Sequence, residues 1–225
     1  MLPDPAPVKA QRRYDASGRR ERARRVQTHV LKVAEELFLR DGYAATTVAT
    51  VATVATAGAV SVETIYKTFG GKPGLIRAIQ QAGLAGAGPR PAPDRSDEMS
   101  SGDLKPHEIL RNWATLTMEV MPRVAPIVLL VRSAGASDPD MATLLDEIND
   151  ERLRRMRHNA QRLADRGALR DGVSTEQAGD VMFAYTAAEL YDVLVTGRRW
   201  TLEMFADFIF RGLCAELLDD GPSVR

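Results

Sequence analysis

Side chains that can bind a polyanion are concentrated between Thr46 and Lys72. The string Ser61-Val-Glu-Thr-Ile-Tyr-Lys67 places hydroxyls, a carboxylate, a phenol and an ammonium group within seven positions. Hydroxyl and ammonium groups donate hydrogen bonds to phosphate oxygens, and side chains of this size reach base edges in the major groove of DNA. These residue types therefore predict contacts with duplex DNA, most of them to phosphates and a few to bases.

The elements around this string predict how it is held. An alanine-, threonine- and valine-rich segment, a Gly58-Ala59 break and a short helical segment follow one another, which is typical of a helix-turn-helix unit. Ser61 is a favourable N-cap for the second helix, and Glu63 lies near the positive end of the helix dipole. Ile65 and Phe69 are expected to face inward, which leaves the polar residues on the groove side.

A tandem repeat leaves the start of the preceding helix open. Residues 48–56 spell Val-Ala-Thr three times. Either Thr46 or Thr47 caps a long helix, or the cap is Thr50 and three residues join the loop after Tyr43. We favour Thr50. That choice places four apolar residues where packing requires them, namely Val51, Val54, Ala55 and Val60.

Charge is divided unevenly along a neutral chain. The 30 Lys and Arg residues balance 30 Asp and Glu residues. Residues 1–80 nevertheless carry 13 basic and 7 acidic side chains, whereas residues 81–225 carry 17 basic and 23 acidic ones. Because DNA is a dense polyanion, the positive N-terminal part is the part expected to approach it.

Length and composition indicate an intracellular protein with one large or two modest domains. The 225 residues contain a single cysteine, Cys214, which excludes an intrachain disulfide and any zinc site built from several cysteines. The first 25 residues lack the apolar core of a signal peptide, and we find no uncharged apolar run of 18 residues. We therefore expect a soluble cytoplasmic protein that has no membrane partner.

Helical periodicity predicts an all-α fold. We expect a disordered basic arm over residues 1–18 and a helix-turn-helix domain over residues 19–83, whose first helix ends at Asp41-Gly42 and whose fourth begins at Lys72-Pro73. A Gly-, Pro- and Ser-rich linker follows over residues 84–103. A second helical domain is expected over residues 104–220, with breaks at Pro122 and Pro126.

Capping signals predict three further helices in this second domain. Ser137-Asp138 begins a helix that extends to about residue 166, and Ser174 begins another that extends to about residue 196. Thr201 begins the last helix, which extends to about residue 218. No segment has the alternating pattern of a strand pair.

The N-terminal motifs resemble one family. Leu37-Phe38, Gly42-Tyr43, Thr46-Thr47-Val48 and the run from Val60 to Lys72 are similar to the tetracycline-repressor (TetR) family of bacterial regulators. The resemblance covers about residues 20–80. The chain departs from the family in its Val-Ala-Thr insertion and in having Gly58-Ala59-Val60 where the family usually has Ala-Gly-Val.

The resemblance implies specific DNA contacts. Tyr66 and Lys72 match phosphate-binding positions, and Thr46 or Thr47 would add a further phosphate contact. Val62, Glu63, Thr64 and Lys67 face the groove. The complete predicted set is Thr46, Thr47, Ser61, Val62, Glu63, Thr64, Tyr66, Lys67 and Lys72.

The resemblance also implies a role for the second domain, which in the family binds a small effector and dimerises through its last two helices. Residues that place isolated polar groups on apolar faces are the expected effector site: Trp113, Thr117, Met121, Arg132, Met156, Asn159, Tyr185 and Glu189. Surplus apolar surface predicts the homodimer interface: Val181, Ala184, Ala188, Tyr191, Val195, Phe205, Phe208, Ile209 and Leu213.

An enzyme and an architectural DNA-binding protein are the two alternative classes. An enzyme is disfavoured because the three histidines stand alone and because no Gly-x-Ser-x-Gly or phosphate-cradling glycine loop occurs, so we expect neither metal nor cofactor. An architectural DNA-binding protein would need no cavity in its second domain. The sequence thus predicts a homodimeric repressor that binds a palindromic operator and is released by an unknown small molecule, with effector-independent DNA binding as the alternative.

Overall fold

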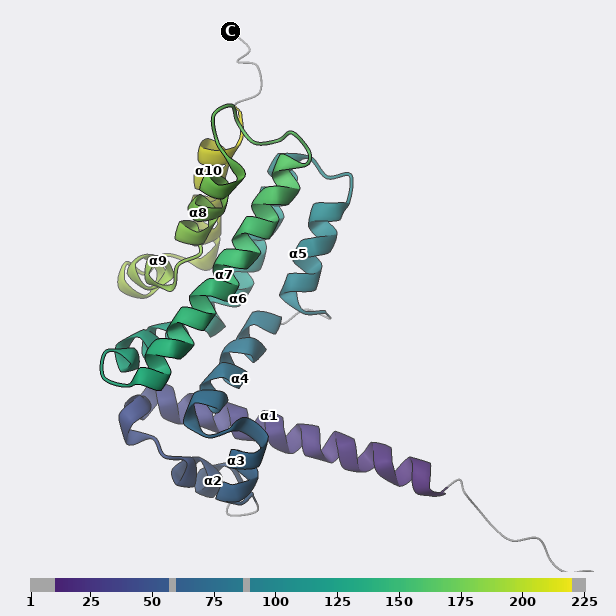
Figure 1. The fold of residues 1–225 in the computed structure, drawn as a ribbon, viewed down its shortest axis with the longest axis vertical. Coiled ribbons are helices and arrows are strands. Elements are labelled where there is room, and N and C mark those ends of the chain that lie inside the picture. The colour runs from purple at the N-terminus through teal and green to yellow at the C-terminus, as the bar shows by residue number, and fades with distance from the viewer. Residues whose placement is uncertain (1–10, 57–59, 87–89, 220–225) are drawn as a thin grey trace, which may run out of the picture.

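The computed structural model describes residues 11–56, 60–86 and 90–219, and within these ranges the chain forms helices and no strand. The predicted all-α class is confirmed. Four helices form the lower part of the molecule in Figure 1: α1 (Gln11–Ala45), α2 (Val48–Thr56), α3 (Val62–Phe69) and α4 (Lys72–Ala85). The upper bundle comprises α5 (Ala92–Ser101), α6 (Pro106–Gly135), α7 (Pro139–Ala164), α8 (Thr175–Tyr185), α9 (Ala188–Tyr191), the π-helix η1 (Asp192–Gly197) and α10 (Leu202–Leu217).

Helix α1 begins earlier than the sequence suggested. The helix begins at Gln11, and its N-terminal part extends away from the other helices (Figure 1). The prediction of a disordered arm is therefore wrong over residues 11–18. Arginine, alanine and glutamate dominate the segment from Gln11 to Arg25, and all three favour helix. Residues 1–10 lie outside the described residues. The predicted end is confirmed, because Gly42 has φ 82° and interrupts the helix.

The start of α2 differs from the start that we favoured. The Thr47 hydroxyl accepts a hydrogen bond from the Thr50 backbone N–H at 3.0 Å, so Thr47 is the cap and the prediction for Thr50 is wrong. Val54 therefore lies on the outer face of α2, with 54% of its surface exposed. A three-residue repeat drifts around a helix of 3.6 residues per turn, and for this reason equivalent valines do not share one face.

Thr46 is a structural residue. Only 1% of its surface is exposed, and its hydroxyl donates to the carbonyl oxygens of Gly42 at 2.9 Å and Leu37 at 3.2 Å. These bonds hold the end of α1 after the interruption at Gly42. A buried hydroxyl cannot reach a phosphate, so the predicted DNA contact of Thr46 is wrong.

Helices α3 and α4 meet at a junction that excludes a side chain. A Cβ atom on Gly74, in the first turn of α4, would overlap the carbonyl oxygen of Phe69 at the end of α3. Gly70 ends α3 in the left-handed conformation, and its N–H donates to the Tyr66 carbonyl oxygen at 2.8 Å. The angle between the two helices is therefore set by backbone packing. Leu75, Ile76 and Ile79 of α4 are buried, as predicted.

The predicted linker contains a helix. Residues 92–101 form α5, which packs against α4, α6 and α7, so the prediction of an unstructured linker over residues 84–103 is wrong in this segment. Its inward residues are small, with Ala92, Ser96 and Ser100 all buried. Sequence hydropathy missed them because alanine and serine do not form a recognisable apolar face.

Helix α6 continues through the two predicted breaks. Pro122 and Pro126 lie inside it, and their neighbours Val124, Ala125 and Ile127 are buried in the core. Tertiary packing thus outweighs the loss of two backbone hydrogen bonds. By length and composition α6 could also cross a membrane, but half of its apolar window is buried inside the protein, as in a core helix of a soluble domain.

The last helices differ from the expected pair of long helices. Asp138 and Thr201 cap α7 and α10 as predicted, and Ser174 caps α8. The helix predicted to extend to residue 196 instead stops at Tyr185. The chain continues through α9 and the π-helical turn η1, which widens the helix beside α10.

We expect the substitution Thr46→Val to lower the free energy of unfolding by about 1 kcal/mol, because the Leu37 and Gly42 carbonyl oxygens lose the buried hydroxyl donor that they share. Urea unfolding of the full chain measures the change. Thr53→Val is the matched control, since the Thr53 hydroxyl is exposed, and its effect should stay within about 0.5 kcal/mol. Equal stabilities of the two variants would contradict the structural role of Thr46.

Candidate nucleic-acid interface and internal cavity

One face of α3 is polar and accessible. Ile65 is 1% exposed and anchors the helix, whereas Val62 and Tyr66 are 39% and 54% exposed. The predicted groove residues Glu63, Thr64 and Lys67 are exposed beside them. The Ser61 hydroxyl accepts a hydrogen bond from the Thr64 N–H at 3.1 Å, which confirms Ser61 as the cap. Helix α3 thus presents its predicted residues together, and their contact with DNA stays a prediction.

The neighbouring helices also carry exposed polar and basic residues. Thr47, Thr50 and Thr53 form an exposed hydroxyl row on α2, of which the sequence analysis singled out only Thr47 as a contact. Exposed arginines crowd the outer part of α1 between residues 19 and 25. Val60 is half-buried just before α3. Gly58 and Ala59 lie outside the described residues, so the altered turn stays a prediction.

Lys72 is held differently from the other candidate contacts. Its ammonium group lies 4.0 Å from the centre of the Tyr43 ring, a cation–π contact that directs the charge inward. Burial lowers the pKa of Lys72, and the negative charge of Asp138 opposes that shift. Its predicted phosphate contact requires the ammonium group to leave this ring.

Tyr43 connects the two parts of the chain. Burial, the charge of Asp138 and a hydrogen bond with Asp138 raise the pKa of Tyr43 to about 12. Asp138 is the N-cap of α7, where it accepts from the N–H of Asp140 at 3.0 Å. The end of α1 and the start of α4 therefore share polar contacts with the first turn of α7.

A cavity of about 320 Å³ lies inside the upper bundle. Helices α4 to α10 all contribute to its wall, with Gln80 and Leu84 from α4 nearest the lower domain. Seven of the eight predicted effector-site residues line it: Trp113, Thr117, Met121, Arg132, Met156, Asn159 and Glu189. Tyr185 does not line it, because its ring packs against Phe208, 5.9 Å away between centroids.

Comparison with known families identifies the lower domain. Residues 30–79 match the family described as bacterial regulatory proteins, tetR family. Residues 30–79 are therefore similar to the domain that this family model describes. No sequence among curated proteins matches the chain. The matched range comprises the inner part of α1, helices α2 and α3 and the first turns of α4, so it covers the polar face of α3 but not the arginines between residues 19 and 25.

Solved structures share the complete fold. The complex of SmeT with triclosan superposes with a TM-score of 0.68 at 19% identity, over 87% of this chain and 93% of that one. A TetR-family regulator from Syntrophomonas wolfei gives 0.69 at 15% identity, over 85% and 94%. NalD of Pseudomonas aeruginosa, the secondary repressor of a multidrug efflux pump, gives 0.65 at 20% identity, over 88% and 98%. The chain therefore has the fold of TetR-family transcriptional regulators.

Three buried polar atoms in the cavity wall lack a hydrogen-bond partner within the described part of the chain: the Trp113 indole N–H, the Asn159 carbonyl oxygen and Glu189 Oε1. Glu189 Oε1 does lie 2.7 Å from Arg132 Nε, as an ion pair, whereas the Trp113 and Asn159 atoms have no partner of any kind there. Trp113 is 6% exposed and Asn159 5%. A buried polar atom without a partner costs about 1–3 kcal/mol. The TetR-like bundle thus holds a donor and an acceptor that a ligand could satisfy.

Arg152 places a positive charge at the same wall. Its Nη1 donates to the Phe183 carbonyl oxygen at 2.7 Å, and its guanidinium group lies 3.5 Å from the centre of the Phe183 ring. Burial lowers the pKa of Arg152 to about 10, a shift that the charge of Glu189 opposes. The group stays charged at neutral pH. Arg152 does not stand out in the sequence, because it lies within the strongly charged stretch of α7.

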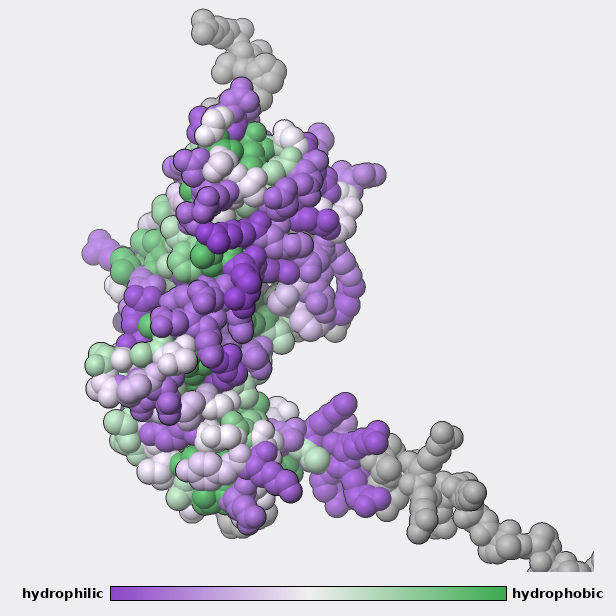
Figure 2. Space-filling model, viewed as in Figure 1, coloured by the Kyte–Doolittle hydropathy of each residue, from purple (hydrophilic) through white to green (hydrophobic). Residues whose placement is uncertain are grey.

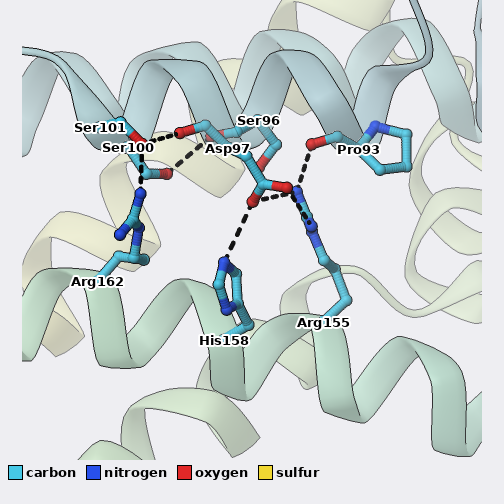
Figure 3. A network of polar contacts seen from close by, with 8 residues as sticks. All are labelled: Pro93, Ser96, Asp97, Ser100, Ser101, Arg155, His158 and Arg162. Atoms are coloured by element: carbon cyan, nitrogen blue, oxygen red, sulfur yellow. Dashed lines mark hydrogen bonds and ion pairs between the residues drawn. The ribbon is translucent and has the colours of Figure 1, made fainter.

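Helix α5 closes one side of the cavity and is fastened to α7 by polar contacts. Figure 3 shows Asp97 between Arg155 and His158, with Nη2 of Arg155 at 3.0 Å and Nε2 of His158 at 3.1 Å from its Oδ1 atom. Arg155 also donates to the Pro93 carbonyl oxygen, and Arg162 donates to the Ser101 hydroxyl. Ala92, Pro93 and Ser96 of this helix line the cavity.

The predicted dimer residues divide into two groups. Ala188, Phe205, Ile209 and Leu213 are buried inside the protomer, so their prediction as interface residues is wrong. They belong to the core of the upper bundle, where α6 packs against both α9 and α10. The remaining predicted residues keep exposed surface: Val181, Ala184, Tyr191, Val195 and Phe208.

Apolar surface does gather on the side of the bundle where α9 lies (Figure 2). Val193 of η1 is 58% exposed and Met204 of α10 is 50% exposed, and the sequence analysis selected neither residue. Val193 lies in the π-helical turn, whereas Met204 lies in the first turn of α10. This surface remains the predicted site of dimerisation.

We expect Asn159→Leu to raise the free energy of unfolding of the unliganded protein by roughly 1 kcal/mol, because an apolar group of similar shape replaces an amide whose oxygen is unpaired. Asn159→Ala should instead destabilise the protein, since it removes volume as well. Urea unfolding measures both variants. Destabilisation by the leucine variant would show that the amide is satisfied.

Asp97 is expected to stabilise the attachment of α5 in a pH-dependent way. Burial acts to raise its pKa, but the hydrogen bond and charge of Arg155 and the charge of His158 lower it overall. A carboxyl group whose pKa is lower in the folded state adds stability above its unfolded pKa, and loses it as pH falls through the folded value.

The difference in stability between wild type and Asp97→Asn should therefore be constant at neutral pH and vanish as pH falls below about 4. Chemical unfolding over a pH series measures it, with Asp103→Asn as the control for an exposed carboxylate that has no ion pair within the described residues. A difference that persists undiminished at low pH would contradict the ion-paired state of Asp97.

Proposed function

We propose that this protein is a cytoplasmic transcriptional repressor that binds a palindromic operator as a homodimer and releases it when a small molecule enters the cavity of the upper bundle. The exposed polar face of α3 is the observation that carries the proposal. Val62, Glu63 and Thr64 would read base edges, Thr47 and Tyr66 would hold phosphates, and Lys67 would reach a guanine edge or a phosphate.

Dimerisation fits the requirement for two reading helices. A palindromic site needs two copies of α3 about one helical turn of DNA apart, or a multiple of that distance. The exposed apolar surface around Val193 and Met204 offers an isologous contact that would fix the spacing. NalD, which has a similar fold, is a repressor.

Release would act through α4. Gln80 and Leu84 of this helix line the cavity, and its first turn abuts α3 at Gly74. A ligand that favours a different position of α4 would therefore change the separation of the two copies of α3. The shift is limited to the difference in the ligand's affinity for the two arrangements. SmeT, another protein of this fold, has been solved with triclosan bound.

The alternative is DNA binding that requires no effector. A protein of that kind gains nothing from a 320 Å³ cavity that contains unpaired polar atoms, so the cavity favours a ligand-responsive regulator. An enzyme is disfavoured because the family model and the proteins of similar fold named above describe regulators.

Selection of bound sequences from a random duplex library, repeated at two salt concentrations, tests the proposal. Enrichment of an inverted repeat is the expected result. Enrichment of no motif, with all binding abolished at moderate salt, would refute sequence-specific recognition. The recovered site then serves as the probe for release by small molecules.

Two substitutions in α3 should separate phosphate contact from general charge. We expect Tyr66→Phe to weaken binding of the selected duplex and of unrelated duplexes alike, by roughly threefold to tenfold, through the loss of one phosphate hydrogen bond. Lys67→Ala should weaken binding and reduce the slope of log K against log salt by about 1.

Fluorescence anisotropy over a salt series measures both effects. Arg154→Gln is the control for Lys67→Ala, because both substitutions remove one positive charge and Arg154 is exposed on α7 of the upper bundle. Unchanged affinity of the Tyr66 and Lys67 variants would refute the proposed role of α3.

A further inference from the structure

We propose that the effector is an amphipathic organic anion whose negative group pairs with Arg152 and whose apolar body lies along α6. The inference rests on the proposed function, because it names the class of ligand that the cavity takes. It is carried by the distribution of charge and of unpaired polar atoms around the cavity wall.

Most of the charge in the wall is already neutralised. Arg132 Nε lies 2.7 Å from Glu189 Oε1, which accounts for two of the charged residues of the wall. Arg155 pairs with Asp97 of α5 at 3.0 Å. Glu151 lies 3.8 Å from a guanidinium nitrogen of Arg77 in α4. Each of these four wall residues therefore has a partner of opposite charge.

Arg152 is the fifth charged residue of the wall, and no carboxylate lies within ion-pair distance of it in the described ranges. Its contacts are with neutral groups: the Phe183 carbonyl oxygen, the Phe183 ring, the Thr186 hydroxyl at 3.4 Å and the Asn149 side-chain oxygen at 3.5 Å. A guanidinium group has five N–H donors in a planar fork, so donors remain for a ligand. The cavity thus has one uncompensated positive charge.

The remaining polar groups would engage a second polar group of the ligand, because Asn159 lies seven residues, or about 10 Å of helix, from Arg152. The Trp113 N–H is a buried donor without an acceptor, which an oxygen of the ligand would supply. Asn159 offers an amide that a hydroxyl or a second oxygen of the ligand would engage. These two residues and Arg152 come from α6 and α7, so a ligand that satisfies them spans the space between the two longest helices of the bundle.

The rest of the cavity fits an apolar body. Leu116, Val120, Met121, Val124 and Val128 contribute aliphatic surface from α6, and Met182 and Leu213 add surface from α8 and α10. Methionines adapt to ligands of different outline, which suits an aliphatic or aromatic body. A volume of about 320 Å³ is at the lower end of the range for small-molecule sites.

A cationic ligand fits this wall less well. The carboxylates of Glu151 and Glu189 are already paired with arginines, so a cation would add to the uncompensated charge of Arg152. A neutral ligand of the same shape would leave that charge unpaired. Because a buried charge without a counter-ion is unfavourable, the anion is the ligand that gains most.

Isothermal titration of the purified full-length protein tests the proposal with two matched series of probes. One series is decanoate, decanol and decylammonium, and the other is phenylbutyrate, phenylbutanol and phenylbutylammonium. We expect the anion of at least one series to bind at least about tenfold more tightly than its neutral and cationic counterparts. Arg152→Gln should abolish this preference, and Arg152→Lys should retain part of it.

Arg154→Gln is the matched control on the same helix, because it removes an exposed arginine and should leave the preference intact. Equal or tighter binding of a neutral or cationic probe would overturn the proposal. It would also be overturned if Arg152→Gln bound the anion as wild type does, or if neither anion bound at concentrations up to about 1 mM.

The titration contains no DNA, so its outcome is independent of the proposed function. If an anion binds through Arg152 but does not release the selected duplex, the ligand class stands and the proposed release by an effector fails. If operator recognition is found but anions show no preference for the cavity, the regulator stands and the ligand class fails.

Discussion

The backbone contact between Gly74 and Phe69 is the constraint on which the arrangement of the molecule depends. A Cβ atom at Gly74 would occupy the space of the Phe69 carbonyl oxygen, so α3 and α4 meet as two backbones. Side chains change rotamer readily, but backbone packing of this kind permits little adjustment. The orientation of α3 is therefore fixed to α4, and α4 in turn forms part of the wall of the cavity. Any displacement of α4 is transmitted to the polar face of α3.

A second connection between the domains is electrostatic. Tyr43 shares Asp138 with the cap of α7, and Lys72 lies against the Tyr43 ring at the start of α4. Three helices thus end or begin around one half-buried carboxylate. Lys72 is also a candidate phosphate ligand. Its ammonium group therefore has two alternative partners, the Tyr43 ring within the protein and a phosphate of DNA outside it. In the cavity, by contrast, the Trp113 N–H and the Asn159 carbonyl oxygen have no hydrogen-bond partner within the described residues. Paired groups are typical of a structural junction, and unpaired groups are typical of a binding site.

The sequence predicted local features well and tertiary ones poorly. The Ser61 cap, the buried Ile65 and the exposed groove residues follow from helical spacing and capping chemistry, and the structure has them. Thr46 and Thr47 could not be separated, because the choice depends on whether carbonyl oxygens of α1 lie within reach. Pro122 and Pro126 looked like breaks, since the packing that outweighs them comes from distant helices. Seven wall residues were recognised from the sequence as isolated polar groups on apolar faces. Arg152 is distinguished from the other charged wall residues only by having no carboxylate within ion-pair distance in the described ranges, which the sequence does not reveal.

The way in which α5 is fastened has a consequence for the rate at which molecules enter and leave the bundle. Its inward residues are alanine and serine, so apolar burial holds it weakly. Arg155 of α7 binds Asp97 and the Pro93 carbonyl oxygen (Figure 3), and Arg166, just after α7, binds the Ser100 carbonyl oxygen. Contacts of this kind are exchanged for water at modest cost. Helix α5 can therefore lift away without unfolding the core formed by α6, α7 and α10. Exchange through this side would be fast and sensitive to ionic strength, even for a ligand that binds tightly.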